Sequence, residues 1–242
     1  MEALTYLYSS GAVFAVYKPA GIHSVQLPGG QGGDSVASML LESRPALAAA
    51  GKSPEDGGLI HRLDFSTSGV LLGASTREAW DSLFAQLAKG EVLKEYAAVV
   101  EGHVSQEQRV SSFIGSPNRG AKKMRSYDKD PGAKARALLG STLFKPLSYD
   151  SERGVSLVAA VAAPARRHQI RVHASSIGHP LVGDSLYGSS ATLGDLASSP
   201  RDFFLHSWLV EFTHPETGAR VAVKSPLADE LSWRGPISWD AS

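Results

Sequence analysis

A polar cluster between two apolar runs is the feature that most constrains how this chain can fold. The cluster spans residues 61–69, and the apolar runs lie at residues 58–60 and 70–72. This pattern predicts a strand, a loop and a second strand, with the polar residues exposed at the break. Alternate side chains of an extended backbone point to opposite faces, so Arg62 and Asp64 share one face while Leu63 points to the other. A cation beside a carboxylate suits an enzyme acting on a polyanion. The simpler alternative is a solvated Arg–Asp pair without a function.

The string His-Arg-Leu-Asp-Phe-Ser-Thr-Ser-Gly at residues 61–69 resembles the catalytic motif of the RluA-type pseudouridine synthases, which isomerise uridine in structured RNA. Four further segments resemble motifs of that family, in the right order, so the resemblance covers about residues 11–226. Three positions depart from the family pattern: Tyr17 replaces asparagine, Ala165 replaces glycine, and Arg167 replaces threonine or serine. The four segments are residues 16–21, residues 94–96, residues 166–173 with 178–188, and residues 205–209.

The order of predicted elements favours an α+β fold. The sequence predicts one helix from the capping box at residues 75–78 to Gly90, with Trp80, Phe84 and Leu87 as its core residues. It predicts a second helix over residues 168–177. It predicts strands at residues 94–101, 155–163 and 203–212, with residues 105–136 leaving the sheet. Because these elements do not alternate regularly, a mixed, largely antiparallel sheet flanked by helices fits best. The resemblance implies the same: one catalytic domain with a bent sheet around a central cleft. We expect residues 1–242 to form this single domain, with a core over about residues 11–226 and no separate N-terminal RNA-binding domain.

The resemblance assigns the chemistry to three residues. Pseudouridine formation needs a carboxylate near the sugar, as in glycosidases, and we assign it to Asp64, as nucleophile or as base. Arg171 is its predicted partner, because a guanidinium favours a charged carboxylate and can hold it in place; the alternative is a helix-surface arginine. Tyr96 is predicted to stack on the uracil and to offer its hydroxyl for a late proton transfer, or else to be a core tyrosine. Leu205 is predicted to close the apolar wall of the pocket.

The remaining predicted site residues contact RNA. A target base in folded RNA must be extruded, and Arg62 is suited to stack in the gap and touch phosphate. His61 is expected to fix the loop by hydrogen bonding. Residues 119–136 carry seven basic and two acidic residues, a net charge of +5 in a chain whose total is zero. This run is a predicted phosphate footprint, or simply a solvated loop. The predicted contacts besides Arg62 and His61 are Arg166, Arg167, Lys122, Lys123 and Arg125.

Composition limits the alternatives. The chain has no cysteine, which excludes a disulfide framework, a thiolate zinc site and a cysteine nucleophile. We expect no metal and no cofactor, a structured ribosomal or transfer RNA as partner, no membrane association, a monomer, and a cytoplasmic location. Two rival functions stay open. One is a nucleoside or glycoside hydrolase that pairs Asp64 with Asp184, and the other is a catalytically silent RNA-binding or ribosome-assembly module.

Overall fold

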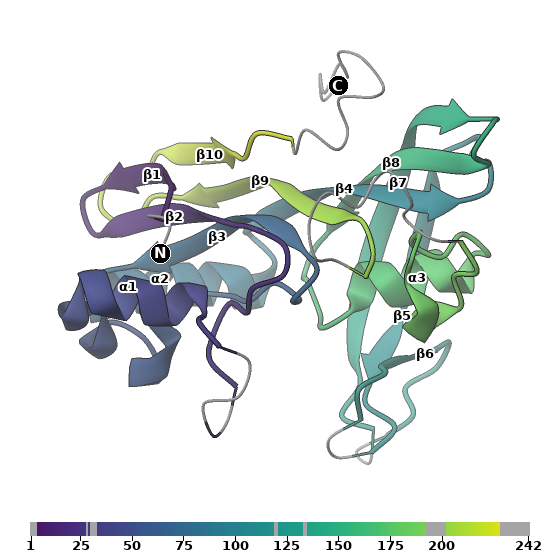
Figure 1. Ribbon diagram of the computed structural model, residues 1–242. Helices are drawn as coiled ribbons and strands as arrows, with labels where there is room; N and C mark the ends of the chain where they lie inside the picture. The colour runs from purple at the N-terminus through teal and green to yellow at the C-terminus, as the bar shows by residue number, and fades with distance from the viewer. Residues whose placement is uncertain are drawn as a thin grey trace.

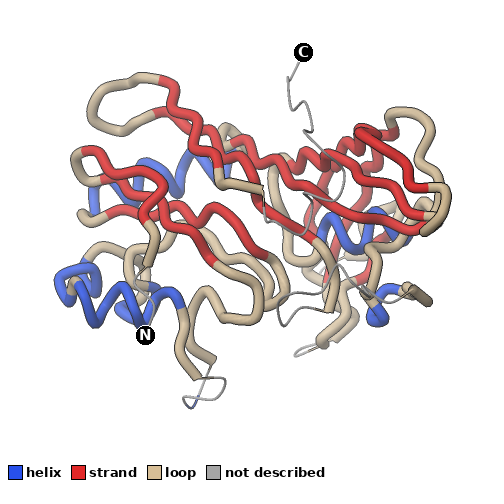
Figure 2. Tube along the Cα trace, turned by 45° about the horizontal axis from the view of Figure 1, so that its top comes forward, coloured by secondary structure: helices blue, strands red, loops and turns tan. Residues whose placement is uncertain are grey.

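One mixed sheet runs across the molecule (Figures 1 and 2). The computed structural model describes residues 4–27, 29, 33–118, 121–132, 135–191 and 202–227. Within these residues the sheet has ten strands: nine follow the order β1-β2-β3-β9-β4-β8-β7-β5-β6, and β10 pairs with β9. The strands are β1 (Tyr6–Ser10), β2 (Val13–Lys18), β3 (Ser68–Ala74), β4 (Leu93–Glu101), β5 (Gln108–Gly115), β6 (Arg125–Tyr127), β7 (Leu138–Asp150), β8 (Val155–Ala162), β9 (Leu205–Thr213) and β10 (Arg220–Lys224).

Three α-helices and short 3-10 turns complete the described part of the chain. Helix α1 (Val36–Ser43) begins at a capping box, in which Ser35 and Ser38 each satisfy the other's backbone N–H. Helix α2 (Arg77–Lys89) begins at Thr76, whose hydroxyl accepts the N–H of Ala79, so the cap lies one residue later than the predicted box. Helix α2 ends at Gly90, as predicted, with φ of +77°. The third helix is α3 (Gln169–Ser176), and 3-10 turns cover Pro45–Ala49, Pro54–Asp56 and Ser185–Tyr187.

The sheet changes direction where β3 meets β9. This pair is parallel and joins only Ser68 with His206 and Gly69 with Ser207, whereas the other strand pairs of the described chain are antiparallel. Gly69 has φ of +113°, and a Cβ there would lie 2.1 Å from the Ser207 carbonyl oxygen. Only glycine permits so close an approach of two backbones. This close approach of β3 to β9 places the polar loop before Gly69 near the centre of the sheet.

Helices cover both faces of the sheet near β2. Phe14 and Val16 pack with α1 and α3 residues in one core cluster, whereas Val13 and Ala15 pack with α2 in another. This division follows from the alternation of side chains along a strand. Figure 1 shows α1 and α2 at the β1–β3 end of the molecule and α3 at the β5–β8 end. Phe84 contradicts the predicted core of α2, because it is 41% exposed and stacks on Trp80 from outside.

The α+β class and the mixed, largely antiparallel sheet are confirmed. Strands β4, β8 and β9 and helix α3 lie within two residues of their predicted positions. The prediction that residues 105–136 leave the sheet is wrong, because β5 pairs with β7 over seven residues and β6 pairs with β5. The run before the polar loop makes only an isolated bridge, between Leu59 and Gly73, and no full strand. Among the described residues, no helix is long and apolar enough to cross a membrane.

Candidate active site

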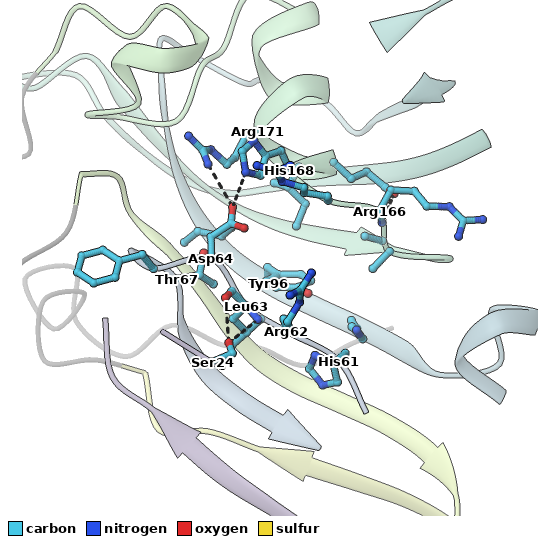
Figure 3. A pocket seen from close by; sticks show the side chains of 18 of the residues that line it. Ser24, His61, Arg62, Leu63, Asp64, Thr67, Tyr96, Arg166, His168 and Arg171 are labelled. Carbon is cyan, nitrogen blue, oxygen red and sulfur yellow. Dashed lines mark hydrogen bonds and ion pairs between the residues drawn. The ribbon is translucent and has the colours of Figure 1, made fainter. Parts of the chain in front are cut away.

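Buried polar groups fix the backbone of the loop that carries Asp64. The Ser24 hydroxyl accepts the N–H of Leu63 and donates to its carbonyl, both at 2.9 Å (Figure 3). The ammonium of Lys18, which is fully buried, donates to the carbonyls of Phe65 at 3.1 Å and Thr67 at 2.7 Å. Leu63 is itself buried in the core, as the alternation predicted. The backbone on both sides of Asp64 is therefore held in place, and its side chain points out of the clamped loop.

Arg171 joins two carboxylates from different parts of the chain. Its Nη1 donates to Asp64 at 3.2 Å, and its Nε and Nη2 donate to Asp184 at 2.7 and 2.9 Å. The guanidinium also lies over the rings of Phe203 and Tyr187, 4.2 and 4.9 Å from their centroids. Burial lowers the pKa of Arg171, but the hydrogen bonds and charges of the two carboxylates outweigh it and raise that pKa. The cation is thus permanently charged and aimed at Asp64.

The two carboxylates bound by Arg171 differ in access. The Asp64 side chain is 29% exposed and lines a cavity of about 550 Å³. The Asp184 side chain is 1% exposed, and both its oxygens accept from Arg171. A buried charge is retained only beside a fixed partner of opposite charge. Arg171 is that partner for Asp184, and Asp184 is that partner for Arg171. Of the two carboxylates, Asp64 is therefore the one that a molecule in the cavity can reach, and Asp184 orients the arginine.

His168 faces Asp64 from the start of α3. Its Nε2 lies 3.8 Å from an Asp64 oxygen, and its Nδ1 lies 2.9 Å from the Tyr187 hydroxyl. Tyr187 accepts the backbone N–H of Met124 at 2.8 Å, and its hydroxyl lies within hydrogen-bond distance of both Nδ1 of His168 and, at 3.5 Å, the Met124 carbonyl. Burial lowers the pKa of His168 to about 4, so the ring is neutral at pH 7. His168 therefore places a nitrogen of a neutral imidazole at the cavity beside Asp64.

Tyr96 and Leu205 form the apolar wall of the cavity. Tyr96 lies on β4 and is 6% exposed, and Leu205 begins β9 and is 5% exposed. Burial, followed by the negative charge of Asp64, raises the pKa of the Tyr96 hydroxyl well above its usual value. The hydroxyl therefore keeps its proton at neutral pH. The wall offers a ring face and a hydrocarbon surface, which is the lining that a flat, uncharged base requires.

A buried lysine lines the same cavity. Lys94 is 3% exposed, and burial lowers its pKa to about 7. His61 lies nearby and is 9% exposed; its Nε2 accepts the N–H of Leu72 at 3.2 Å, which fixes the loop as predicted. Burial, followed by the charge of Lys94, lowers the pKa of His61. Figure 3 shows Arg62 between Asp64 and His61. Arg62 is exposed and lines the cavity.

The structure brings most of the predicted site residues into one cavity. Asp64, Tyr96 and Arg171 line it together with five of the other residues predicted to contact the substrate. The basic residues of the 119–136 run that were predicted to bind phosphate do not line it. They lie on and before β6, next to Arg167, whose guanidinium is 3.4 Å from the Lys122 carbonyl. The five that line the cavity are Arg62, His61, Leu205, Arg166 and Arg167, and the three outside it are Lys122, Lys123 and Arg125.

Lys94 and His168 line the cavity although the sequence motifs assign neither of them a catalytic role. Lys94 lies two residues before Tyr96 in a predicted strand, so the two side chains share one face of that strand. The alternation of strand side chains therefore already indicates that Lys94 lies beside Tyr96. His168 begins a predicted helix, but only the fold shows that its ring faces Asp64. Among the described residues, no group of three or more potential ligands is placed to hold a metal ion.

Comparison with known proteins decides the family. The model of the RNA pseudouridylate synthase family matches residues 12–176. The chain belongs to this family. The ribosomal large subunit pseudouridine synthase D of Pseudomonas aeruginosa is 32% identical over 238 residues, covering 95% of this chain and 70% of that protein. The protein of the same name from Nitrosomonas europaea is 33% identical over 236 residues, covering 95% of this chain and 63% of that protein.

A solved structure agrees with the sequence comparison. Human RNA pseudouridylate synthase domain containing 1 is 26% identical and superposes with a TM-score of 0.69, covering 94% of this chain and 86% of that one. The predicted family, fold class and reaction class, the isomerisation of uridine to pseudouridine in RNA, are thereby confirmed. The chain spans 63% to 70% of the length of the two bacterial relatives.

Proposed function

We propose that this chain converts a uridine of large-subunit ribosomal RNA to pseudouridine, with Asp64 as the reacting carboxylate. The substrate follows from the names of the bacterial relatives, which are ribosomal large subunit pseudouridine synthases. The observation that carries the assignment of Asp64 is its contact with Arg171, which is itself held by the buried Asp184. A fixed cation that is hydrogen-bonded to a carboxylate at the edge of a cavity holds that carboxylate in position.

The reaction rearranges bonds without a net gain or loss of atoms in the RNA. The C1′–N1 bond breaks, the uracil turns within the pocket, and a C1′–C5 bond forms. The proton on C5 leaves and N1 gains one. Asp64 either attacks C1′ and is released when the C1′–C5 bond forms, or removes a proton from the neighbouring sugar carbon and later returns it. In both cases Arg171 holds the carboxylate in position. Tyr96 supplies a ring face against the uracil and a protonated hydroxyl for the late proton transfer.

The target base has to leave its stack to reach Asp64. Arg62 is exposed at the cavity and suited to fill the gap that the base leaves. Arg166 and Arg167 line the cavity. The exposed cations Lys122, Lys123 and Arg125, here called those of the β5–β6 connection although Arg125 is the first residue of β6, follow in the segment whose Lys122 carbonyl contacts Arg167. These positive groups supply the phosphate contacts that any RNA ligand needs. Transfer RNA as a substrate, a monomeric state and a cytoplasmic location stay predictions.

Of the rival functions, hydrolysis is disfavoured by the state of Asp184. A hydrolase that pairs two carboxylates needs both of them open to substrate. Asp184 is 1% exposed and does not line the cavity, and both its oxygens are occupied by Arg171. The silent RNA-binding module is the outcome that the following experiment separates from catalysis.

Tritium release tests the proposal. Large-subunit ribosomal RNA carrying tritium at uracil C5, taken from cells that lack this protein, is incubated with the wild type and with Asp64→Asn. Forming the C1′–C5 bond expels the C5 hydrogen. We expect release by the wild type and a loss of at least about 10³-fold in the variant, as for other nucleophiles and bases, with RNA affinity retained. Binding by both proteins without release by either would establish the silent module. Free uracil among the products would establish a hydrolase.

A further inference from the structure

Phe65 is a large apolar side chain exposed directly beside the reacting carboxylate. Its side chain lines the same cavity as Asp64, yet the residue is 38% exposed, whereas Tyr96 is 6% exposed. Tyr96 therefore belongs to the buried wall of the cavity and Phe65 to its rim. Burial in this chain's own core does not account for an aromatic ring at that position.

The ring of Phe65 stands on a backbone that cannot easily move. Its carbonyl accepts the N–H of Gly21 at 2.9 Å as well as the Lys18 ammonium. The His23 ring lies against it, with centroids 4.8 Å apart and planes inclined by 48°. His23 is held in turn, because its carbonyl accepts the N–H of Val36 at the start of α1 at 2.9 Å. The two rings thus form a preorganised aromatic platform that is open to solvent on one side.

We propose that this platform, Phe65 backed by His23, stacks on an unpaired nucleobase next to the target uridine in the RNA chain. The proposal rests on the proposed function. A uridine that enters the cavity leaves its chain neighbours at the rim, where Phe65 is the exposed aromatic side chain adjacent to Asp64. Single-stranded RNA is bound by stacking bases on aromatic rings beside cations that contact phosphate. Arg62, exposed at the same cavity, supplies the cation.

Stacking rather than base-edge recognition is the expected mode. The Phe65 ring offers a π-face and no hydrogen-bonding group, so it accepts any base, with purines favoured by their larger face. The site would then select RNA in which the nucleotide beside the target can leave its own stack. That property distinguishes loops and bulges from regular duplex.

Phe84 provides a matched control. It is 41% exposed, close to the 38% of Phe65, and it also stacks on a neighbouring ring, that of Trp80 at 4.7 Å. It lies on α2 and does not line the cavity. Phe84→Ala therefore removes the same exposed surface without touching the proposed platform.

The experiment measures tritium release from a synthetic RNA that contains the uridine mapped with the wild type. We expect Phe65→Ala to lower kcat/KM about tenfold, which corresponds to ~1.4 kcal/mol of base stacking. Phe65→Trp and Phe65→Tyr should keep activity, since both preserve the ring. Phe84→Ala should match the wild type.

An abasic nucleotide on either side of the target identifies the stacked base. At one of the two positions the abasic substrate should cost the wild type about tenfold and cost Phe65→Ala nothing further, because the partner ring is already gone. Wild-type activity in Phe65→Ala, or losses that multiply at both positions, would overturn the stacking contact alone. No release by the wild type from any RNA would overturn the proposed function, and the stacking contact with it.

Discussion

The charged groups of the cavity and those of the β5–β6 connection are built in opposite ways. Arg171, Asp184 and Lys94 are nearly fully buried, and the two members of the ion pair satisfy each other through two hydrogen bonds. Lys122, Lys123 and Arg125 are all exposed. Within the same molecule, one region therefore holds its charges at a cost in solvation, and the other leaves them in water.

This difference teaches where each kind of charge acts. A buried charge has a fixed direction and works in a medium that strengthens its field, which suits the positioning of a reacting carboxylate. An exposed cation has no fixed direction, but it releases counterions from RNA, which suits long-range attraction. Removing a buried charge should therefore change the free energy of unfolding and its dependence on pH. Removing an exposed charge should change only the affinity for RNA and its dependence on salt.

The largest expected effect comes from breaking the buried pair. Arg171→Met should lower the free energy of unfolding by about 3–5 kcal/mol, because it leaves Asp184 charged and unpaired in the interior. The double variant Arg171→Met with Asp184→Leu should regain most of that stability, since neither charge is left. Neither variant should release tritium, because Asp64 has lost its partner in both. Urea unfolding together with the tritium assay checks both statements.

A restored fold without restored activity separates positioning from stability. If the double variant were as active as the wild type, the contact between Arg171 and Asp64 would have no part in the reaction. If Arg171→Met alone unfolded at the same urea concentration as the wild type, Asp184 would not be the costly buried charge that the geometry indicates.

The next effect in size belongs to Lys94. In the unfolded chain a lysine keeps its proton up to about pH 10.5, whereas burial lowers the pKa of Lys94 to about 7 in the folded protein. Between these values the unfolded state binds more protons, so stability rises with pH. The free energy of unfolding of the wild type relative to Lys94→Met should increase by about 2 kcal/mol from pH 7 to pH 9. A difference between the two proteins that stays constant over this range would contradict a buried, titrating Lys94.

The sequence allowed the local parts of the site to be predicted. Arg62, Leu63 and Asp64 alternate between exposed and buried positions, as the strand-like pattern predicts. The resemblance to a known family supplied the pairing of Asp64 with Arg171, residues that lie 107 positions apart. No local propensity links two such positions.

What could not be predicted depends on contacts between distant segments. Residues 105–136 are polar and basic, which is typical of a loop, but β5 is a strand because β7 pairs with it. The Ser68 hydroxyl lies 2.8 Å from Nδ1 of His206 on β9, a residue 138 positions away in the chain. The same holds for the Met124–Tyr187–His168 chain of hydrogen bonds. In each case the partner is brought close by the fold, and the residues next to it in the sequence do not indicate the contact.

The smallest effect on stability, and the sharpest contrast with the cavity, is expected for the exposed cations. Replacing Lys122, Lys123 and Arg125 by glutamine should change the free energy of unfolding by less than about 0.5 kcal/mol, since surface charges contribute little. The dependence of log affinity for RNA on log salt should become shallower by about 2 to 3, one counterion for each lost phosphate contact. A control that replaces Arg44, Lys52 and Lys224, exposed cations outside the cavity lining, should leave that slope close to the wild-type value. Equal slopes in the two triple variants would mean that RNA senses only the total charge of the chain. A change confined to the first triple variant would place the phosphate contacts on the β5–β6 connection, where water, and not the protein interior, surrounds the charges.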